Sequence, residues 1–225
     1  MDEAALYFAR SLTIDTLLKD SIINVYNTLA TNALRIDDPQ RALTLYQEIV
    51  KLVPEYDQTQ NLFIIGDLNY DQGNYIKALE AYALALLHDS TSARAKKAQY
   101  RYITCLKESD SLEYALELAL NQYEALKTSA NLLQLNEIRY ALGKKTFEQG
   151  YLDSAEVYFQ HIIDMQEPRT LLDAAYYYLG EIRYARNDTD GALSMYKKVL
   201  RLNPYEKGEL VQRAKDRIQE IKEKS

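Results

Sequence analysis

Alanine recurs at a nearly regular interval along this chain of 225 residues, with spacings of 36, 37, 40 and 37 residues. The five positions, called anchors below, are Ala42, Ala78, Ala115, Ala155 and Ala192. A period of roughly 20 to 50 residues is typical of proteins built from stacked supersecondary units, because one unit alone cannot bury its hydrophobic face. We therefore expect an array of five repeats in place of one or two globular cores.

Two further positions recur in the same register. Twelve residues before the anchors is a slot for small side chains, which let two helices approach closely; it holds Ala30, Gly66, Ile103, Gly143 and Gly180. Four residues after the anchors is a slot for rings, which fill the space between neighbouring units; it holds Tyr46, Tyr82, Ala119, Phe159 and Tyr196. The third repeat has neither the small residue nor the ring, so it departs furthest from the pattern.

Turn-forming residues precede each anchor and divide the repeats into short helices. These segments are Asp37–Pro39, Gln72–Asn74, Ser109–Ser111, Gln149–Gly150 and Asn187–Asp188. Pro54, Pro168 and Pro204 lie near the ends of repeats, since proline cannot continue a helix interior. The chain has only 7 Gly and 4 Pro and is rich in helix-forming residues, so we expect an all-α protein.

The small slot, the aromatic slot and the prolines at repeat ends together resemble the tetratricopeptide repeat, a helix-turn-helix unit of roughly 34 residues. The resemblance covers nearly the whole chain and implies a right-handed α-solenoid that forms a single domain over residues 1–225. The sequence departs from the family pattern in its longer spacings and in having no Trp. The expected repeats span residues 23–56, 59–92, 96–129, 136–169 and 173–206.

The two ends of the chain extend beyond these repeats. Residues 1–16 resemble the second helix of a preceding repeat, with Ala4 as its anchor and Phe8 in the aromatic slot. We expect from this that the chain is a segment of a longer repeat protein. Residues 207–225 carry an apolar stripe on a charged helix, which predicts a helix that caps the last repeat; the stripe is Leu210, Ala214, Ile218 and Ile221.

The resemblance also implies where a ligand would bind, because the first helices of successive tetratricopeptide repeats line a concave groove. The stripe expected to face inward is rich in rings with polar tips, which suit recognition of a peptide. The candidate peptide-binding residues are Asn27, Phe63, Tyr70, Lys97, Tyr100, Arg101, Tyr140, Lys144, Phe147, Tyr177 and Tyr184.

Alternatives stay open for these residues. The rings could instead pack between repeats, as many of the 20 Tyr must. Lys97 and Arg101 match part of the clamp with which some tetratricopeptide domains hold the terminal carboxylate of chaperones, but Asn27, Thr31 and Ile64 supply too few donors for it. The basic pair is then either a site for another acidic group or a solvated pair on a surface of mixed sign.

Charge and composition argue against several classes of function. A formal net charge of −6 disfavours a nucleic-acid partner, which needs clustered Lys and Arg. The longest apolar runs, such as residues 82–87, are far shorter than the roughly 20 residues of a membrane-spanning helix, so we expect no membrane insertion. Cys105 stands alone, and His88 and His161 have no neighbour at metal-ligand spacing; we expect no metal, no cofactor and no catalytic residue.

The expected function is that of a protein–protein interaction scaffold or adaptor, not that of an enzyme. A second hypothesis is a homo-oligomer formed through the solenoid ends, since a truncated first repeat exposes Leu6, Phe8 and Leu12. A third is a regulatory or sensor region of a larger signalling or envelope protein. The residues do not distinguish a cytoplasmic from a periplasmic location for such a soluble domain.

Overall fold

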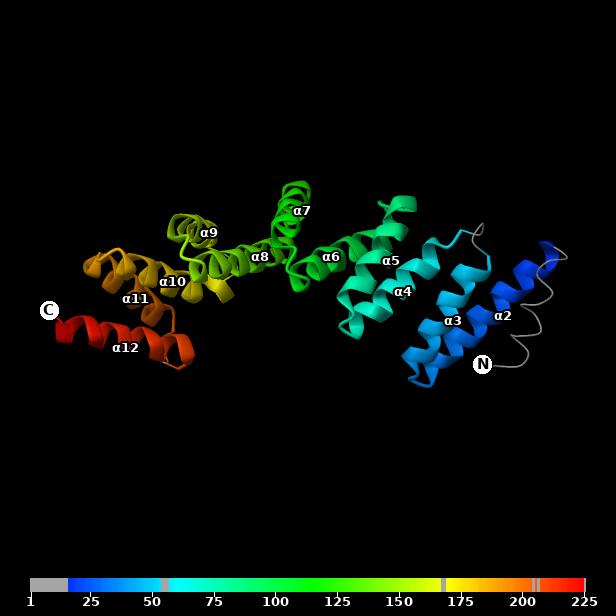
Figure 1. Cartoon of the computed structure of the whole chain (residues 1–225), viewed down its shortest axis with the longest axis horizontal. Helices are drawn as coiled ribbons and strands as arrows, with labels where there is room; N and C mark the ends of the chain where they lie inside the picture. Colours follow the sequence, from blue (N-terminus) through cyan, green and yellow to red (C-terminus); the bar gives the residue numbers. More distant parts are fainter. Residues whose placement is uncertain (1–15, 54–56, 167–168, 204, 206, 225) are drawn as a thin grey trace. The chain divides into compact units, whose positions relative to one another are not determined.

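Eleven α-helices and one short 3-10 helix make up the part of the chain that the computed structural model describes (Figure 1). That part comprises residues 16–53, 57–166, 169–203, 205 and 207–224. Sequential helices form antiparallel pairs, so the all-α helical-repeat fold predicted from the sequence is confirmed. The chain divides into two compact units, Met1–Asp110 and Ser111–Ser225, which are described separately below.

Unit 1 contains five helices, each packed against the next along the chain, and α6 also contacts α4. They are α2 (Thr16–Arg35), α3 (Pro39–Leu52), α4 (Thr59–Asp71), α5 (Tyr75–His88) and α6 (Ala93–Glu108). One cluster of buried side chains joins α2, α3, α4 and α5, and a second joins α4, α5 and α6. The helix expected over residues 1–16 lies outside the described residues, apart from Thr16 at the start of α2.

Unit 2 contains six α-helices and the 3-10 helix η1. They are α7 (Leu112–Ala125), α8 (Ser129–Glu148), α9 (Leu152–Met165), η1 (Arg169–Leu171), α10 (Leu172–Ala185), α11 (Thr189–Leu202) and α12 (Glu209–Lys224). The last helix packs against both α10 and α11 through Val211, Ala214 and Ile221, while its other residues are partly or fully exposed.

A left-handed residue ends the first helix of every repeat, always five residues before the anchor alanine. These residues are Asp37, Gly73, Asp110, Gly150 and Asn187, with φ between 58° and 82°. Asp, Asn and Gly are the residues that tolerate this conformation best. At the second of these turns, the Gly73 amide donates to the Tyr70 carbonyl and the Asn74 amide to the Asn69 carbonyl, the pattern of a Schellman cap. The repeat spacing in the sequence therefore has a direct backbone counterpart.

Side-chain caps begin several of the following helices. The Asp38 carboxylate accepts a hydrogen bond from the Arg41 amide at the start of α3, where Pro39 occupies the first turn as its fixed φ favours. Asp188 accepts from the Gly191 amide at the start of α11 in the same way. These local signals end one helix and start the next within two or three residues.

The small slots let an aromatic ring lie directly against helix backbone. A methyl group added at Gly66 would come within 2.5 Å of the fully buried Tyr82 ring. The two corresponding distances in unit 2 are 2.8 Å between Gly143 and Phe159 and 2.5 Å between Gly180 and Tyr196. Only glycine permits so close an approach, and burying such a ring contributes about 1.5–3 kcal/mol to stability.

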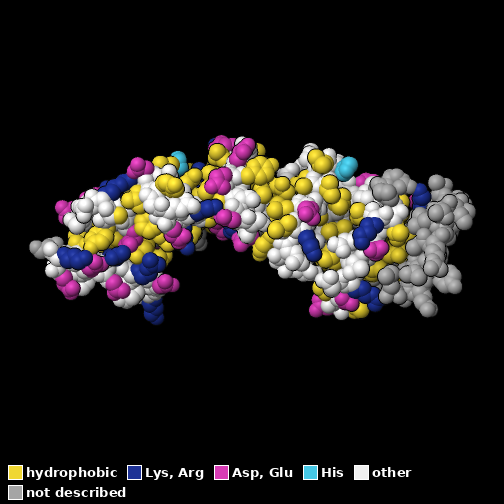
Figure 2. Space-filling view, in the orientation of Figure 1, with side chains coloured by type: hydrophobic (Ala, Val, Ile, Leu, Met, Phe, Trp, Pro, Cys, Tyr) yellow, Lys and Arg dark blue, Asp and Glu magenta, His cyan; other side chains and the backbone are white. Residues whose placement is uncertain are grey.

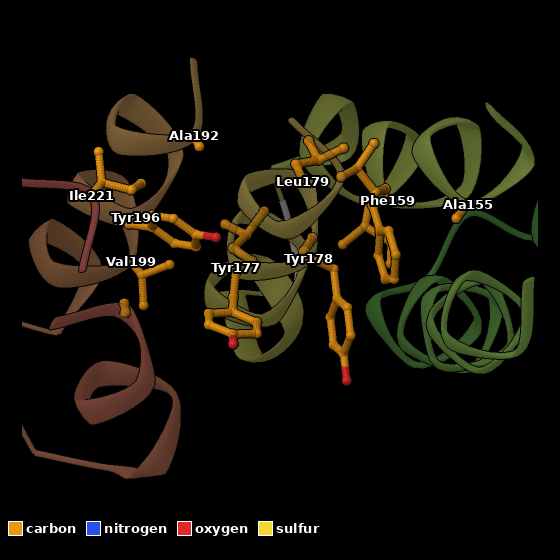
Figure 3. Close-up of a cluster of buried hydrophobic side chains, with 14 residues drawn as sticks. Ala155, Phe159, Tyr177, Tyr178, Leu179, Ala192, Tyr196, Val199 and Ile221 are labelled. Carbon is orange, nitrogen blue, oxygen red and sulfur yellow. The ribbon is translucent and has the colours of Figure 1, made fainter. Parts of the chain in front are cut away.

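Aromatic packing continues on both sides of α10 in the core of unit 2. Phe159 and Tyr178 stack face to face, with ring centroids 5.0 Å apart, and Tyr177 lies between Tyr178 and Tyr196 (Figure 3). Offset-stacked and edge-on ring pairs add about 0.5–1.5 kcal/mol each beyond the area they bury. Four rings thus pack together with aliphatic side chains in the core of unit 2.

The boundary between the units falls within the expected third repeat, after Asp110. This is the repeat with Ile103 in the small slot and Ala119 in the aromatic slot. Ile103 stands in place of a small residue, and Ala119 stands in place of a ring. The sequence of this repeat therefore provides no contact between a ring and a glycine to join its two helices. The division of the chain into units thus falls where the sequence pattern is weakest.

A carboxylate triad connects three helices in unit 1. Asp67, directly after the small-slot glycine on α4, accepts a hydrogen bond from the Tyr82 hydroxyl on α5 at 2.7 Å. It also accepts one from Arg101 Nη1 on α6 at 3.0 Å. Burial raises the pKa of Tyr82, and its hydrogen bond to Asp67 raises it further, so the hydroxyl remains a donor at neutral pH. The triad joins both helices of one repeat to the helix that follows.

The same triad recurs in unit 2 with Glu181 on α10. Its carboxylate accepts from the Tyr196 hydroxyl on α11 at 2.7 Å and from two nitrogens of Arg217 on α12 at 2.7 and 2.8 Å. Burial alone would favour the neutral acid, but the hydrogen bonds from Arg217 and Tyr196 outweigh it and lower the pKa of Glu181. Arg217 on α12 therefore occupies the role that Arg101 has on α6.

The fourth repeat lacks both the carboxylate and the hydroxyl. There Lys144 follows the glycine in place of an acid, and the ring in the aromatic slot is Phe159, which has no hydroxyl. A tyrosine hydroxyl buried beside a lysine would lack the acceptor it has in the other two repeats, and an unsatisfied buried polar group is costly.

Within the described ranges, no helix combines the length and the apolar character needed to cross a membrane.

We predict that Gly180→Ala destabilises unit 2. Alanine favours the helix by about 1 kcal/mol over glycine, but its methyl group would overlap the Tyr196 ring, and overpacking of this kind costs about 1–3 kcal/mol. Chemical unfolding followed by circular dichroism should give a lower free energy of unfolding. In a Tyr196→Ala background the same substitution should be neutral or stabilising; a gain in stability in the wild-type background would contradict the close ring contact.

We also predict that Glu181→Gln and Tyr196→Phe each lower the free energy of unfolding at pH 7, by about 1–3 kcal/mol, since each leaves a buried partner short of a hydrogen bond. Because the folded-state pKa of Glu181 is lowered, its stabilisation is present above the unfolded-state pKa of about 4.3 and is lost as the pH falls below it. The difference between wild type and Glu181→Gln should therefore shrink below about pH 4. Glu223→Gln, on the exposed side of α12, is the matched control; an equal effect there would argue against the triad.

Candidate functional site

The predicted site residues lie on the first helices of the repeats. In unit 1, Asn27 is on α2, Phe63 and Tyr70 are on α4, and Lys97, Tyr100 and Arg101 are on α6; in unit 2, Tyr140, Lys144 and Phe147 are on α8, and Tyr177 and Tyr184 are on α10. Only residues of the same unit are compared below.

The two rings of α4 differ in depth. Phe63 is fully buried in the core of unit 1, beneath the guanidinium of Arg94 at 5.8 Å. Tyr70 is half-buried: it meets Tyr75 edge-on at 6.0 Å, and the guanidinium of Arg101 lies over its ring at 4.5 Å. Tyr70 therefore keeps one accessible edge, whereas Phe63 supports the surface from below.

Three cations of α6 converge on the Asp67 carboxylate. Arg101 lies at 3.0 Å and also pairs with Asp71 at 3.1 Å, while Lys97 and Arg94 lie at 3.6 and 3.7 Å. The Arg101 side chain is only 19% exposed, whereas that of Lys97 is 57% exposed. Of the basic pair singled out in the sequence, Arg101 is thus occupied by carboxylates of its own unit, and Lys97 faces solvent.

In unit 2, the rings of α8 gather around Tyr178. Tyr140 and Phe147 contact its ring edge-on, with centroids 6.0 and 5.5 Å apart. The ammonium of Lys144 lies over the Tyr140 ring at 6.0 Å. Burial, together with the neighbouring Tyr178, raises the pKa of Tyr140 to about 12, so this hydroxyl is neutral at physiological pH. Tyr140, Lys144 and Phe147 are all half-buried and present edges to solvent.

The rings of α10 are covered by cations of α12. Tyr177 is buried, and the guanidinium of Arg213 lies over its ring at 4.7 Å. Tyr184 is half-buried beneath Arg217 at 5.3 Å and Lys224 at 5.9 Å. Figure 2 shows basic and acidic side chains intermingled over this part of unit 2.

A group of ion pairs surrounds Tyr184 near the C-terminal end of α10. The Tyr184 hydroxyl donates to Glu220 Oε1 at 3.2 Å, and Glu220 also pairs with Lys224 at 2.6 Å and Arg217 at 2.8 Å. The hydrogen bonds from Lys224 and Arg217 lower the pKa of Glu220 to about 2. This carboxylate therefore stays charged and paired over the physiological range.

Several residues of these surfaces were not predicted from the sequence. Arg94 lies seven residues before Arg101, two helical turns along the same face of α6, and this spacing was a signal that could have been used. Arg213 and Arg217 belong to a helix to which only a capping role was assigned. The sequence signal for these two arginines is weaker, because no small slot and no aromatic slot was assigned to the segment that forms α12.

No chemistry-bearing cluster emerges from the part of the chain that the structure describes. His88 and His161 are exposed on α5 and α9, and no group of His, Cys, Asp and Glu side chains there could hold a metal ion. Cys105 is buried, and burial raises the pKa of its thiol to about 12. A thiol of this kind stays protonated and is a poor nucleophile.

Among models of protein families, one described as tetratricopeptide repeat matches residues 27–96 of this chain. A search of curated proteins by sequence gives no match. Proteins with this repeat generally mediate protein–protein interactions and are typically not enzymes.

Solved structures share the fold at low sequence identity. MamA from residue 41 to its end, from Desulfovibrio magneticus RS-1, is 19% identical with a TM-score of 0.52, and the match covers 83% of this chain and 97% of that chain. A TPR repeats protein (BF2334) from Bacteroides fragilis NCTC 9343 is 15% identical with a TM-score of 0.54, covering 90% and 99%. YrrB, a TPR protein with an unusual peptide-binding site, is 19% identical with a TM-score of 0.53, covering 93% and 97%.

Residues 27–96 thus match the tetratricopeptide repeat family, and the helix pairs of the described chain have the fold of solved tetratricopeptide repeat proteins.

Proposed function

We propose that this chain is a scaffold that binds a segment of a partner protein along the first helices of its repeats. The observation that carries the proposal is the set of half-buried rings whose positions are held by cations of a neighbouring helix. Tyr70 under Arg101 and Tyr184 under Arg217 are the two examples with the same geometry, one in each unit.

Rings held in this way suit peptide recognition energetically. Ordering a free side chain at an interface costs about 0.5–1.5 kcal/mol, and most of that cost is already met for a ring fixed by packing. A tyrosine also offers an apolar face and a hydroxyl in one rigid group. A partner segment that crosses α4 and α6, or α8 and α10, would therefore bind to a surface that needs little rearrangement.

The candidate residues divide into two roles under this proposal. Phe63, Tyr177 and Arg101 are largely buried and position their neighbours. Direct contacts with the partner come from accessible side chains of the same helices: Asn27, Tyr70, Lys97, Tyr100, Tyr140, Lys144, Phe147 and Tyr184.

The other two hypotheses have less support. Self-association was expected through Leu6, Phe8 and Leu12, which lie outside the described residues. A molar mass that stays at one chain across protein concentrations would remove this alternative to the scaffold. A regulatory or sensor role within a larger protein is compatible with the scaffold proposal, since it would use the same surface.

We predict that the bound partner lies against the first helices of the repeats and not against the second helices. The photo-reactive residue p-benzoylphenylalanine would be placed at Tyr70, Tyr100 or Tyr184, and for comparison at Leu84 or Val157, which are exposed on α5 and α9. Irradiation in lysate followed by mass spectrometry should give a shared cross-linked partner from the first three positions.

The comparison positions carry the same photo-reactive ring and are more exposed than the three test positions, so random collision would favour them. Cross-links that arise mainly from Leu84 and Val157 would place the partner on the second helices and would overturn the proposed surface. Circular dichroism of each variant should first confirm an unchanged helix content.

A further inference from the structure

The two carboxylate triads are accompanied by a second recurrent arrangement. Three residues before the small-slot glycine, each unit has a buried ring, Phe63 or Tyr177, and each ring lies beneath a guanidinium from the helix after next. In unit 1 this cation is Arg94 on α6, and in unit 2 it is Arg213 on α12. Each unit therefore places two arginines on neighbouring rings of the same first helix.

The two arginines of a unit differ in their carboxylate partners. In unit 2, Arg217 makes a bidentate pair with Glu181, at 2.7 and 2.8 Å. Arg213 has its nearest carboxylate at 3.9 Å, on the almost fully exposed Glu209, and its own side chain is 46% exposed. An exposed pair at this distance contributes little, so Glu209 is easily displaced. Arg213 is held mainly by the Tyr177 ring beneath it.

Unit 1 shows the same division. Arg101 lies at 3.0 Å from Asp67, whereas Arg94 is at 3.7 Å and is 38% exposed. The Nε atom of Arg94 is buried and has no hydrogen-bond partner within the described structure. Because this atom is closed to solvent, a ligand carboxylate would approach the exposed part of the Arg94 side chain.

We propose that the partner segment is acidic and that each unit offers its own docking position for a carboxylate, at Arg94 with Lys97 in unit 1 and at Arg213 in unit 2. This inference rests on the proposed function, since it names the chemistry of the segment bound along the first helices. A guanidinium stacked on a ring keeps its N–H edge available for a bidentate carboxylate.

Local charge supports an acidic ligand although the whole chain carries −6. In unit 1, the three cations Arg94, Lys97 and Arg101 face two carboxylates, Asp67 and Asp71, which leaves one positive charge. At physiological ionic strength, charges farther away than about 8 Å are largely screened. The excess within the site therefore outweighs the net charge of the chain.

Three carboxylates of α10 and α12 are likewise occupied. Glu181 is neutralised by Arg217, and Glu220 is paired with Lys224. Asp173 accepts a hydrogen bond from the Ala174 amide at 2.8 Å. Arg213 is paired only weakly, with the exposed Glu209, so a ligand carboxylate can take the place of that partner.

The test begins with a phage library of random dodecapeptides. The wild-type chain would be compared with the double variant Arg94→Gln/Arg213→Gln. The matched control is Lys96→Gln/Lys222→Gln, which removes the same charge from exposed positions on the same two helices. Wild type and control should select peptides enriched in Asp and Glu, and the double variant should lose that enrichment. Thermal unfolding would confirm that all three proteins are folded.

Fluorescence anisotropy then gives the affinity. A selected peptide should bind the wild-type chain roughly tenfold more tightly than its version with Asn and Gln in place of Asp and Glu, for each carboxylate that docks. Against the double variant the two versions should bind equally.

Two results would overturn the inference in different ways. If the wild-type chain selects peptides without acidic enrichment, or if the double variant selects equally acidic ones, the acidic ligand is rejected while peptide binding stands. If the wild-type chain selects no peptide, the proposed function is rejected together with the acidic ligand.

Discussion

The contact between a buried ring and the backbone of a glycine, made at Gly66, Gly143 and Gly180, is the constraint on which three of the helix pairs depend. It brings the second helix of a repeat close enough for a ring to lie against the first. Where the ring is tyrosine, the same contact carries its hydroxyl past the helix to the residue that follows the glycine. The position of the acidic residue in the sequence is thus a consequence of ring packing.

The carboxylate triads follow from this geometry. A half-buried carboxylate such as Glu181 is stable only when its oxygens accept strong hydrogen bonds, because desolvation penalises the charge. The tyrosine supplies one donor, and the arginine of the next helix supplies the others. The arginine is therefore fixed in place, and its guanidinium comes to rest on the tyrosine one turn further along the first helix. The hydrogen bonds between repeats and the stacking of arginine on tyrosine at the surface therefore both follow from the position of this carboxylate.

The repeat architecture was readable from the sequence because its signals are local and periodic. The turn residues, the small slots and the tyrosines of the aromatic slots each depend on contacts within one helix pair. The depth of the site residues was not readable in this way. Helical periodicity places Phe63, Tyr70, Tyr177 and Tyr184 on one stripe but does not reveal that the first ring of each pair is covered by an arginine and buried.

Partners between helices were equally hidden. Arg101 pairs with Asp67, 34 residues earlier in the chain, and Arg217 pairs with Glu181, 36 residues earlier. A search of one helix at a time finds a basic pair on α6 and a charged stripe on α12, and it cannot tell which of these cations is already matched. To tell matched from unmatched cations, the positions of the neighbouring helices are needed. The sequence pattern is weakest in the third repeat, which contains α6, and in α12, so it gives the least information about these two helices.

Helix α12 combines two requirements in one amphipathic sequence. Its inner face has to match the apolar edge of α10 and α11, and Val211, Ala214 and Ile221 do so. Its outer face has to remain polar, because no further helix of the described chain covers it. The border between the two faces then holds the long cationic side chains, whose stems lie on apolar surface while their charged ends reach the rings of α10. A helix suited to ending the hydrophobic stack thereby also supplies Arg213 to the surface, so stability and ligand recognition depend on the same element.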